Sequence, residues 1–399
     1  MKFLLLNQTF YPDFVATGQY LSEVAVELAR RGHAVTVVTS RRAYDDPGRR
    51  FPKTEIWNGV RILRVGSTGF GKGAQWRRAA DFGTNMLCCL GRVACLPRQD
   101  VVVALTSPPL ISVLGALAAR RWRARFYYWV MDFNPDEAVA AGWLRPGSLA
   151  FRALEAMSRF SLRTATRVIA LDRFMRDRIL AKQILPERVA VVPPWSHDGE
   201  VRFDAAGRER FRHAHGLTGR FVVMHSGNHS PVHPLDTLMQ AAARLRDDPG
   251  VVFCFVGGGS EFHRVKAWAG REHLPNVLCL PYQPLAQLSA SLSAADVQVV
   301  VMGEPFVGLI HPCKIYNIMA VGAPVLYVGP ELSHLSEILR ELEPAYLWAA
   351  AVHGDAGRVV SEIARLRAAP PRARPIPDLA ANFSQQRLLP QMVNLLESG

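Results

Sequence analysis

The stretch KFLLLNQTFYPDFVATGQYLSEVAVELARRGHAVTVVTS, residues 2–40, decides the fold. Its first segment, KFLLLN, is a short apolar run typical of a buried strand. Apolar residues then recur at helical spacing from Tyr20 to Leu28, Gly32 ends the helix, and AVTVVTS is a second strand. A strand, helix and strand in this order form the basic unit of a parallel sheet.

The same alternation continues along the first half of the chain. Strand patterns occur in GVRILRV (59–65), DVVVAL (100–105), RFYYWVMD (125–132) and RVIALD (167–172), and a helical region spans 149–164. The segment RVAVVPPWSHDGE (188–200) then breaks at two prolines followed by polar residues. We therefore predict a doubly wound, Rossmann-like α/β domain over residues 1–195.

A second alternation begins at FVVMHSGN (221–228) and continues to KIYNIMAVGAPVLYVG (314–329). It predicts another doubly wound, Rossmann-like domain over residues 196–377, and the 399-residue length agrees with two domains. The pattern PDLAANFSQQRLLPQMVNLLES (377–398) predicts a last amphipathic helix. In such folds ligands bind at the carboxyl ends of the strands, so we expect substrates between the two domains.

The formal net charge is +13, and 41 of the 47 basic residues are arginines. This excess has two interpretations: codon bias, or attraction to phosphates in an anionic lipid or a nucleotide. A nucleic-acid partner is not expected, because the sequence has no helix-turn-helix, RNA-binding or zinc-finger pattern.

The six cysteines form no C-x-x-C pair and lie in apolar sequence, which is typical of buried thiols in a reducing compartment. The residues after Met1 predict a strand and not a signal peptide. The longest apolar run, 101–119, contains two prolines and is better explained as strand, turn and helix than as a membrane span. We therefore expect a cytoplasmic protein.

Two candidate sites follow strands of the first domain. Thr17 and Gly18 come at a helix start, where backbone N–H groups can bind an anion or a polyol, although the glycine also permits a simple tight turn. Asp132 and Asp136 follow a strand end. Asp132 suits an acid–base or acceptor-orienting role, while an Asx turn and a helix cap are the structural alternatives.

The segment HSGNHSPVHPLDTL (225–238) places three histidines four residues apart. This spacing aligns metal ligands only on a continuous helix, and the glycine and two prolines of the segment exclude one, so no metal is expected. A loop before a helix start favours a pyrophosphate, bound by Gly227, Asn228, His229 and, when protonated, His233. The alternative is a surface loop whose histidines contact only water.

Two further segments are candidates for the same ligand. VGGGSEF (256–262) is a glycine turn after a strand but lacks the full dinucleotide-binding pattern, so Gly258 is weak evidence alone. In MGEPFVGLIHPCKIYNIMAVGAPVLYVG (302–329), Lys314 lies near a helix start within reach of a phosphate, Asn317 follows one turn later and Glu304 precedes them. A solvated helix charge is the alternative for Lys314.

Two segments mix arginines with aromatic residues, 70–98 and 118–128. Such segments fit an anionic membrane surface. A buried helix with an arginine-rich exposed edge explains them equally well.

Together, the segments 7–40, 130–144, 226–238, 255–262 and 311–329 resemble the bacterial GT-B-fold glycosyltransferases of family 4, in particular those that build exopolysaccharide and surface polysaccharide of the colanic-acid and O-antigen type. The resemblance implies a GT-B fold, an acceptor-binding first domain and a nucleotide-sugar-binding second domain. It also implies that the terminal helix, 378–399, crosses back onto the first domain. Sugar transfer of the hexosyltransferase type would be retaining and need no metal or other cofactor.

The resemblance places the diphosphate between the 227–233 loop and the helix that starts near Lys314. It implies a polyprenyl-diphosphate-linked sugar as acceptor and a peripheral location on the cytoplasmic face of the inner membrane. The expected site residues are, for catalysis, Asp132, His233 and Lys314; for the donor, Gly227, Asn228, His229, His233, Gly258, Glu304, Lys314 and Asn317; and for the acceptor, Thr17, Gly18 and Asp132.

The chain departs from the family pattern at several positions. Many members carry two glutamates eight residues apart before a motif of the AMAxG type, and here these positions are Leu309 and Asn317. His233 replaces the usual arginine or lysine, and Met131 replaces a common histidine. A nucleotide-sugar epimerase and a non-catalytic nucleotide-sugar-binding subunit on the same fold therefore remain alternatives.

Overall fold

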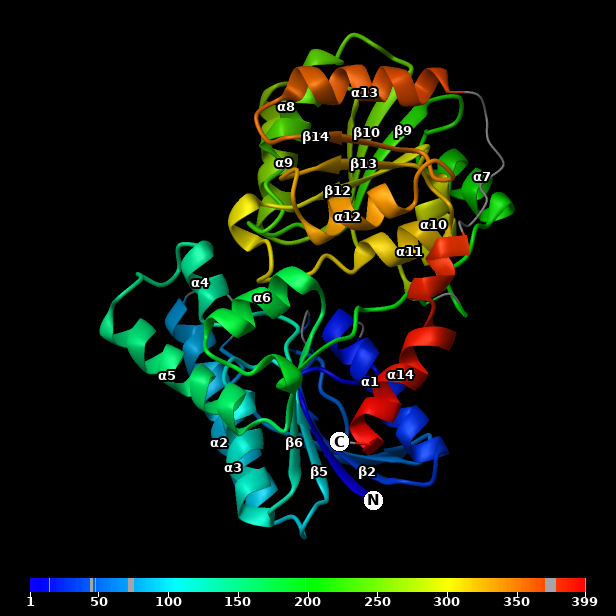
Figure 1. Ribbon diagram of the computed structural model, residues 1–399. Helices are drawn as coiled ribbons and strands as arrows, with labels where there is room; N and C mark the ends of the chain where they lie inside the picture. Colours follow the sequence, from blue (N-terminus) through cyan, green and yellow to red (C-terminus); the bar gives the residue numbers. More distant parts are fainter. Residues whose placement is uncertain are drawn as a thin grey trace. The chain divides into compact units, whose positions relative to one another are not determined.

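The computed structural model describes residues 1–13, 15–43, 46, 48–70, 75–197, 199–369 and 378–398. It divides into two compact units, each with its own parallel sheet (Figure 1). The first unit contains 1–193, 308–311 and 388–399, and the second contains 194–307 and 312–387. Both are α/β units with helices around a sheet, which confirms the predicted fold class.

The sheet of the first unit has eight strands in the order β3-β4-β2-β1-β5-β6-β7-β8. All pairings are parallel except that of β3, a short edge strand not expected from the sequence. The strands are β1 (Lys2–Leu6), β2 (Ala34–Ser40), β3 (Thr54–Trp57), β4 (Val60–Val65), β5 (Val101–Ala104), β6 (Arg125–Trp129), β7 (Arg167–Ala170) and β8 (Val189–Val191). The order reverses between β1 and β5, so β1, β5 and β6 bring three loops together at one edge.

The helices of the first unit are α1 (Ala16–Arg30), α2 (Gln75–Ala94), α3 (Ile111–Trp122), α4 (Asp136–Ala140), α5 (Leu149–Thr164), α6 (Arg173–Ala181) and the 3-10 turn η1 (Pro186–Arg188). The terminal helix α14 (Gln385–Ser398) packs beside α1 (Figure 1, red and blue). Glu397 near its end accepts hydrogen bonds from Arg31 at 2.7 Å and pairs with His33 at 2.6 Å.

The second unit has a six-stranded parallel sheet in the order β11-β10-β9-β12-β13-β14. The strands are β9 (Phe221–Asn228), β10 (Val251–Gly258), β11 (Val277–Leu280), β12 (Val297–Val301), β13 (Val325–Val328) and β14 (Trp348–Ala351). The helices are α7 (Ala205–Ala214), α8 (Asp236–Arg244), α9 (Ser260–Arg271), α10 (Leu288–Ala294), α11 (Lys314–Ala320), α12 (His334–Glu341) and α13 (Ala356–Ala368), with the 3-10 turns η2 (Leu285–Gln287), η3 (Glu304–Phe306) and η4 (Asp378–Phe383).

Both faces of this second sheet are covered. Val223 and Phe253 pack on one face with α8 and α13, whereas Val222 and Cys254 pack on the other with α7 and α10. Because side chains alternate along a strand, a sheet buried on both faces needs continuous apolar runs, and VVFCFV in β10 is such a run.

Two expectations from the sequence are wrong. The terminal pattern is not one helix, because η4 and α14 are separate and Ser384 between them pairs with Ser196. The cysteines are not all buried, because Cys88 and Cys95 are exposed, although all six are free thiols. No helix in the described ranges is both long and apolar enough to cross a membrane.

Candidate active site

Two glycine turns of the second unit lie side by side at the carboxyl ends of β9 and β10. Gly227 pairs in register with Gly257, and Asn228 pairs with Gly258. Gly257 has φ +141°, and a Cβ there would fall on the carbonyl oxygen of Gly227. A glycine is therefore required where the two turns touch. The VGGGSEF turn (256–262), which alone is weak evidence for a phosphate site, thus lies directly against the SGN turn (226–228).

The three histidines of the 225–238 segment are buried, so they do not belong to a surface loop that contacts only water. Each donates its Nδ1–H to a backbone carbonyl: His225 to Val299 at 3.0 Å and His233 to Val301 at 2.7 Å. His229 donates in the same way to Gly227 at 2.8 Å. These bonds fix one tautomer, in which Nε2 of each neutral ring is an acceptor.

Lys314 begins α11 and reaches this histidine cluster. Its Nζ lies 3.2 Å from Nε2 of His225, and a Cβ built on Gly227 would lie 3.5 Å from Nζ. Among the described residues Nζ has no carboxylate partner. Lys314 is therefore a partly buried amine beside the glycine turns and not a solvated helix charge.

The pKa values of the cluster follow from burial. Burial lowers the pKa of Lys314 to about 7. Burial first and the Lys314 charge second lower the pKa of His229 to about 4 and that of His233 to about 3. The same causes hold the pKa of His225 well below its usual range. The histidines are therefore neutral at pH 7, and the expected charge on His233 is absent without a ligand.

This arrangement is suited to an anion. Two glycine turns expose backbone, Lys314 supplies the charge, and Nε2 of His229 is buried with no hydrogen-bond partner among the described residues. A phosphate beside these groups favours their protonated forms, which then donate hydrogen bonds to it. The geometry thus brings together Gly227, Asn228, His229, His233, Gly258 and Lys314.

The other expected donor residues lie differently. The side-chain oxygen of Asn317 accepts a hydrogen bond from the backbone N–H of His197 at 3.1 Å, so it holds the 194–197 segment. Glu304 is exposed in η3.

A Cβ on Gly258 would lie 2.9 Å from the ring of Tyr282, so the aromatic ring flanks the second turn. Sequence reasoning missed Tyr282, which carries no motif.

The expected acceptor residues of the first unit lie at the carboxyl ends of β1 and β6. The backbone N–H of Asp132 donates to Thr106 Oγ1 at 3.3 Å, and burial raises the pKa of the Asp132 carboxyl to about 6, opposed by a hydrogen bond with Thr106. Gly18 and Thr17 are in the first turn of α1, where Thr17 Oγ1 is 3.0 Å from Thr9 Oγ1. A Cβ on Gly18 would lie 3.1 Å from Thr9.

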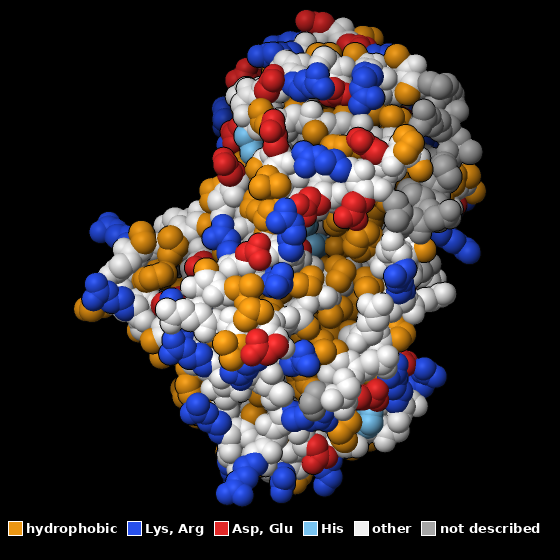
Figure 2. Space-filling view, in the orientation of Figure 1, with side chains coloured by type: hydrophobic (Ala, Val, Ile, Leu, Met, Phe, Trp, Pro, Cys, Tyr) orange, Lys and Arg blue, Asp and Glu red, His pale blue; other side chains and the backbone are white. Residues whose placement is uncertain are grey.

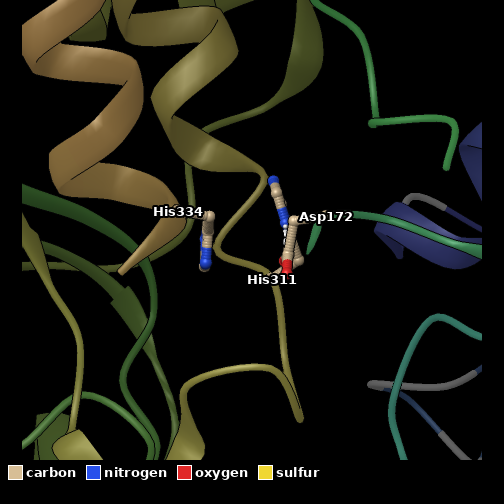
Figure 3. Close-up of side chains that lie close together, drawn as sticks. All are labelled: Asp172, His311 and His334. Atoms are coloured by element: carbon tan, nitrogen blue, oxygen red, sulfur yellow. Dashed lines mark hydrogen bonds and ion pairs between the residues drawn. The ribbon is translucent and has the colours of Figure 1, made fainter. Parts of the chain in front are cut away.

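A second polar pair in the first unit was not expected from the sequence. His311 Nδ1 donates to Asp172 at 2.8 Å, and Asp172 also caps α6 by accepting from the N–H of Met175 at 2.8 Å. Figure 3 shows the two side chains meeting at this bond, one from the start of α6 and one from the 308–311 segment. That segment is held in place by the N–H of Phe133, which donates to the carbonyl of Leu309 at 2.8 Å.

Two family models match the chain. The model of the glycosyl transferase 4-like domain matches residues 16–195, and that of glycosyl transferases group 1 matches residues 207–363. Together they span most of the sequence and both units. The chain is a GT-B-fold glycosyltransferase of family 4.

Known proteins agree with this assignment. The glycosyltransferase is 24% identical over 372 residues to the putative colanic acid biosynthesis glycosyl transferase WcaI of Escherichia coli, covering 85% of this chain and 86% of that protein. It is 27% identical over 248 residues to the probable glycosyltransferase WbjE of Pseudomonas aeruginosa, covering 61% of each.

Solved structures share the fold. Anabaena HepE, in complex with UDP and glucose, aligns over 100% of both chains with a TM-score of 0.73 and 16% identity. Sucrose-phosphate synthase from Thermosynechococcus elongatus aligns over 100% of this glycosyltransferase and 98% of its own chain, with a TM-score of 0.76 and 16% identity.

Proposed function

We propose that the enzyme moves a sugar from a nucleotide-sugar to a polyprenyl-diphosphate-linked glycan during synthesis of a surface or exopolysaccharide. Transfer is retaining and needs no metal or other cofactor. The observation that carries the donor assignment is the contact of Lys314 with the histidine cluster beside the glycine turns. The relative named for colanic acid biosynthesis and the neighbour in complex with UDP and glucose support the substrate classes.

In this proposal the second unit holds the donor. The diphosphate lies against the Gly227–His233 loop and the start of α11, where Lys314 and protonated His229 donate to its oxygens. Charge grows on this diphosphate as the bond to the sugar breaks. Positive groups in a partly buried site stabilise that charge strongly, so Lys314 contributes to catalysis and to binding. His233 adds a further positive group when the phosphate favours its protonation.

The first unit holds the acceptor. Asp132 orients the acceptor hydroxyl, and Thr17 and Gly18 at the start of α1 contact its polar groups. The acceptor oxygen bonds to the anomeric carbon on the face that the diphosphate leaves, and the hydroxyl proton passes to the leaving diphosphate. The ionised carboxylate is the useful form of Asp132 because it accepts the hydroxyl hydrogen bond more strongly and has no proton of its own to donate.

The enzyme works in this account on the cytoplasmic face of the inner membrane, as a peripheral protein. The arginine-rich helices α3 and α5 of the first unit support this location, because exposed basic residues are attracted to anionic lipid. The lipid-linked acceptor is found at the same surface.

Transfer of label tests the proposal. The purified enzyme is incubated with radiolabelled UDP-, GDP-, ADP- and dTDP-sugars and a polyprenyl-diphosphate monosaccharide. We expect label in the lipid fraction with one donor and loss of that label in Lys314→Gln. Interconversion of a nucleotide-sugar without any acceptor would instead indicate an epimerase and contradict the proposal.

A further inference from the structure

The first unit contains an apolar groove that the donor and acceptor residues do not use. Its volume is about 430 Å³, within the range of about 300–1,000 Å³ typical of ligand sites. It lies between α2, α3 and α5. Phe82, Gly83 and Met86 of α2, Val113 and Leu117 of α3, and Met157 of α5 are among its lining residues. Apart from Gly83, all carry apolar side chains.

Several apolar side chains in and beside the groove are exposed to solvent. Leu90, Leu117 and Met157 are 48%, 49% and 44% exposed, and the neighbouring Leu87 is 68% exposed. Apolar side chains this exposed, gathered on one surface, mark a binding site more often than an ordinary surface. An extended hydrocarbon fits such a site, since no polar side chain lines it.

The surroundings of the groove are basic. Exposed arginines lie in the first turns of two of its helices, Arg77 in α2 and Arg152 in α5, and Arg120 and Arg121 end α3. The one carboxylate of α2, Asp81, accepts hydrogen bonds from Thr68 and Phe70. Figure 2 shows orange and blue side chains interspersed over the part of the first unit that carries α5 and α3. The charge therefore complements an anionic head group on an apolar chain.

One end of the groove adjoins the candidate acceptor site. Pro109 and Leu110 line the groove and follow Thr106, whose Oγ1 accepts from the N–H of Asp132. On the α5 side, Ser158 next to Met157 donates to the carbonyl of Asn134 at 3.1 Å, two residues after Asp132. A ligand with its polar head at Asp132 would thus lie beside the segments that form this end of the groove.

We propose that this groove binds the first isoprene units of the polyprenyl chain of the acceptor, next to its diphosphate. The inference rests on the proposed function, since it assigns the lipid part of the acceptor to a place on the enzyme. The position of the groove next to Asp132 favours the acceptor chain over a bilayer phospholipid, because only the acceptor has its polar head at Asp132 in the proposed function.

Filling the groove tests this inference. Gly83 lines the groove, and a Cβ added there meets no atom within 4 Å, so Gly83→Trp fills the space without disturbing the core. Gly91→Trp is the matched control, because Gly91 lies on the same helix, is equally open and does not line the groove. Both replacements remove a helical glycine, so neither is expected to weaken α2.

The probes are dimethylallyl, geranyl and farnesyl diphosphate, titrated below their micelle concentrations. We expect farnesyl diphosphate to bind wild type and Gly91→Trp at least about tenfold more tightly than dimethylallyl diphosphate, because apolar burial grows with the chain. In Gly83→Trp we expect farnesyl diphosphate to bind less than about threefold more tightly than dimethylallyl diphosphate. Equal binding of all three probes by wild type, or an undiminished gain in Gly83→Trp, overturns the inference.

Two parallel measurements separate the possible failures. Nucleotide-sugar binding by the same variants reports on the proposed function, and we expect Gly83→Trp to leave it unchanged. If nucleotide-sugars bind but chain length has no effect, the groove inference alone fails. If affinity increases with chain length but no sugar is transferred in the radiolabel assay, the proposed function fails. Sedimentation with phosphatidylglycerol vesicles that is lost in Gly83→Trp would assign the groove to a phospholipid and overturn the acceptor assignment.

Discussion

The Nζ atom of Lys314 lies 3.2 Å from Nε2 of His225, although 89 residues separate them in the chain. The Nδ1–H of His225 donates to the carbonyl of Val299, so Nε2 is an acceptor and the lysine ammonium donates to it. The histidine ring therefore orients Lys314 toward the glycine turns without neutralising its charge, as a carboxylate would.

The affinity for nucleoside diphosphates is expected to fall above pH 7. Burial lowers the pKa of Lys314 to about 7, and a bound diphosphate raises it again. Below pH 7 the ammonium is already present, whereas above pH 7 binding must take up a proton. Affinity then falls by up to about tenfold per pH unit until the pKa of the complex is reached. Titration calorimetry in buffers of different ionisation enthalpy measures the proton uptake.

Lys314→Arg is the comparison for that experiment. The guanidinium stays charged throughout the range, so its binding curve should be flat between pH 7 and 9. The account is contradicted if wild type and Lys314→Arg share one pH dependence.

The free energy of unfolding should fall as the pH drops from about 6.5 to 4. The folded-state pKa is about 4 for His229 and about 3 for His233, below the value of about 6.5 for an unfolded histidine. In this window the unfolded chain binds protons that the folded chain does not, so stability is lost by a few kcal/mol. Urea titrations at pH 7.5 and 5 measure the loss.

The control compares two histidine variants. His233→Gln should lose less stability than wild type when the pH is lowered. His213 is exposed on α7, so His213→Gln should lose as much stability as wild type. The same loss in both variants would show that the buried histidines are not the titrating groups.

Asp132→Asn is expected to reduce kcat about 10²-fold or more while leaving nucleotide affinity unchanged. Burial raises the pKa of Asp132 to about 6, and its ionised form is required, so wild-type activity should fall as the pH drops through this value. Thr106→Val removes a hydrogen bond that lowers the pKa, so the acid limb of the pH–rate profile should move to higher pH. If the acid limb of Thr106→Val stays at the wild-type pH, a group other than Asp132 causes the loss of activity at low pH.

Gly257→Ala should lower both the affinity for nucleotide and the free energy of unfolding. Its φ is +141°, and the new Cβ meets the carbonyl of Gly227, which we expect to cost about 1–3 kcal/mol. Gly270→Ala in α9, where a Cβ meets nothing, should stabilise the protein by up to about 1 kcal/mol. Thermal unfolding with and without nucleotide measures both effects. A Gly257→Ala protein that binds nucleotide normally would show that the two turns do not form the site.

Much of the fold was predictable because apolar runs and helix periods are local signals. The helix over 149–164 was predicted with its observed bounds, and the strands β1, β2 and β9 lie within their predicted segments. The edge strand β3 and the break at Ser384 were not predicted. The break at Ser384 depends on pairing with the distant Ser196, which no local pattern reveals. The strand β3 instead pairs with the adjacent β4 across Asn58-Gly59, a local turn signal that could have revealed the hairpin.

The site was predictable as a set of segments but not as a geometry. The sequence indicated the Gly227–His233 loop and Lys314, yet only the fold shows that the loop is buried and that Lys314 lies against His225. Burial also lowers the pKa of His233, so the charge expected on it depends on a bound phosphate. The Asp172–His311 pair had no signal, because its members are 139 residues apart.

The most direct test of the account compares the affinity for a nucleoside diphosphate with that for its nucleoside. UDP, GDP, ADP, dTDP and the monophosphate CMP are screened by thermal shift, and the best-binding diphosphate and its nucleoside are titrated into wild type, Lys314→Gln and Lys266→Gln. Lys266 is exposed on α9 and serves as the matched control. Loss of a charge-assisted bond should lower the diphosphate-to-nucleoside affinity ratio at least about tenfold in Lys314→Gln and leave it unchanged in Lys266→Gln. An equal ratio in all three proteins would contradict the assignment of Lys314 and the histidine loop to the donor diphosphate.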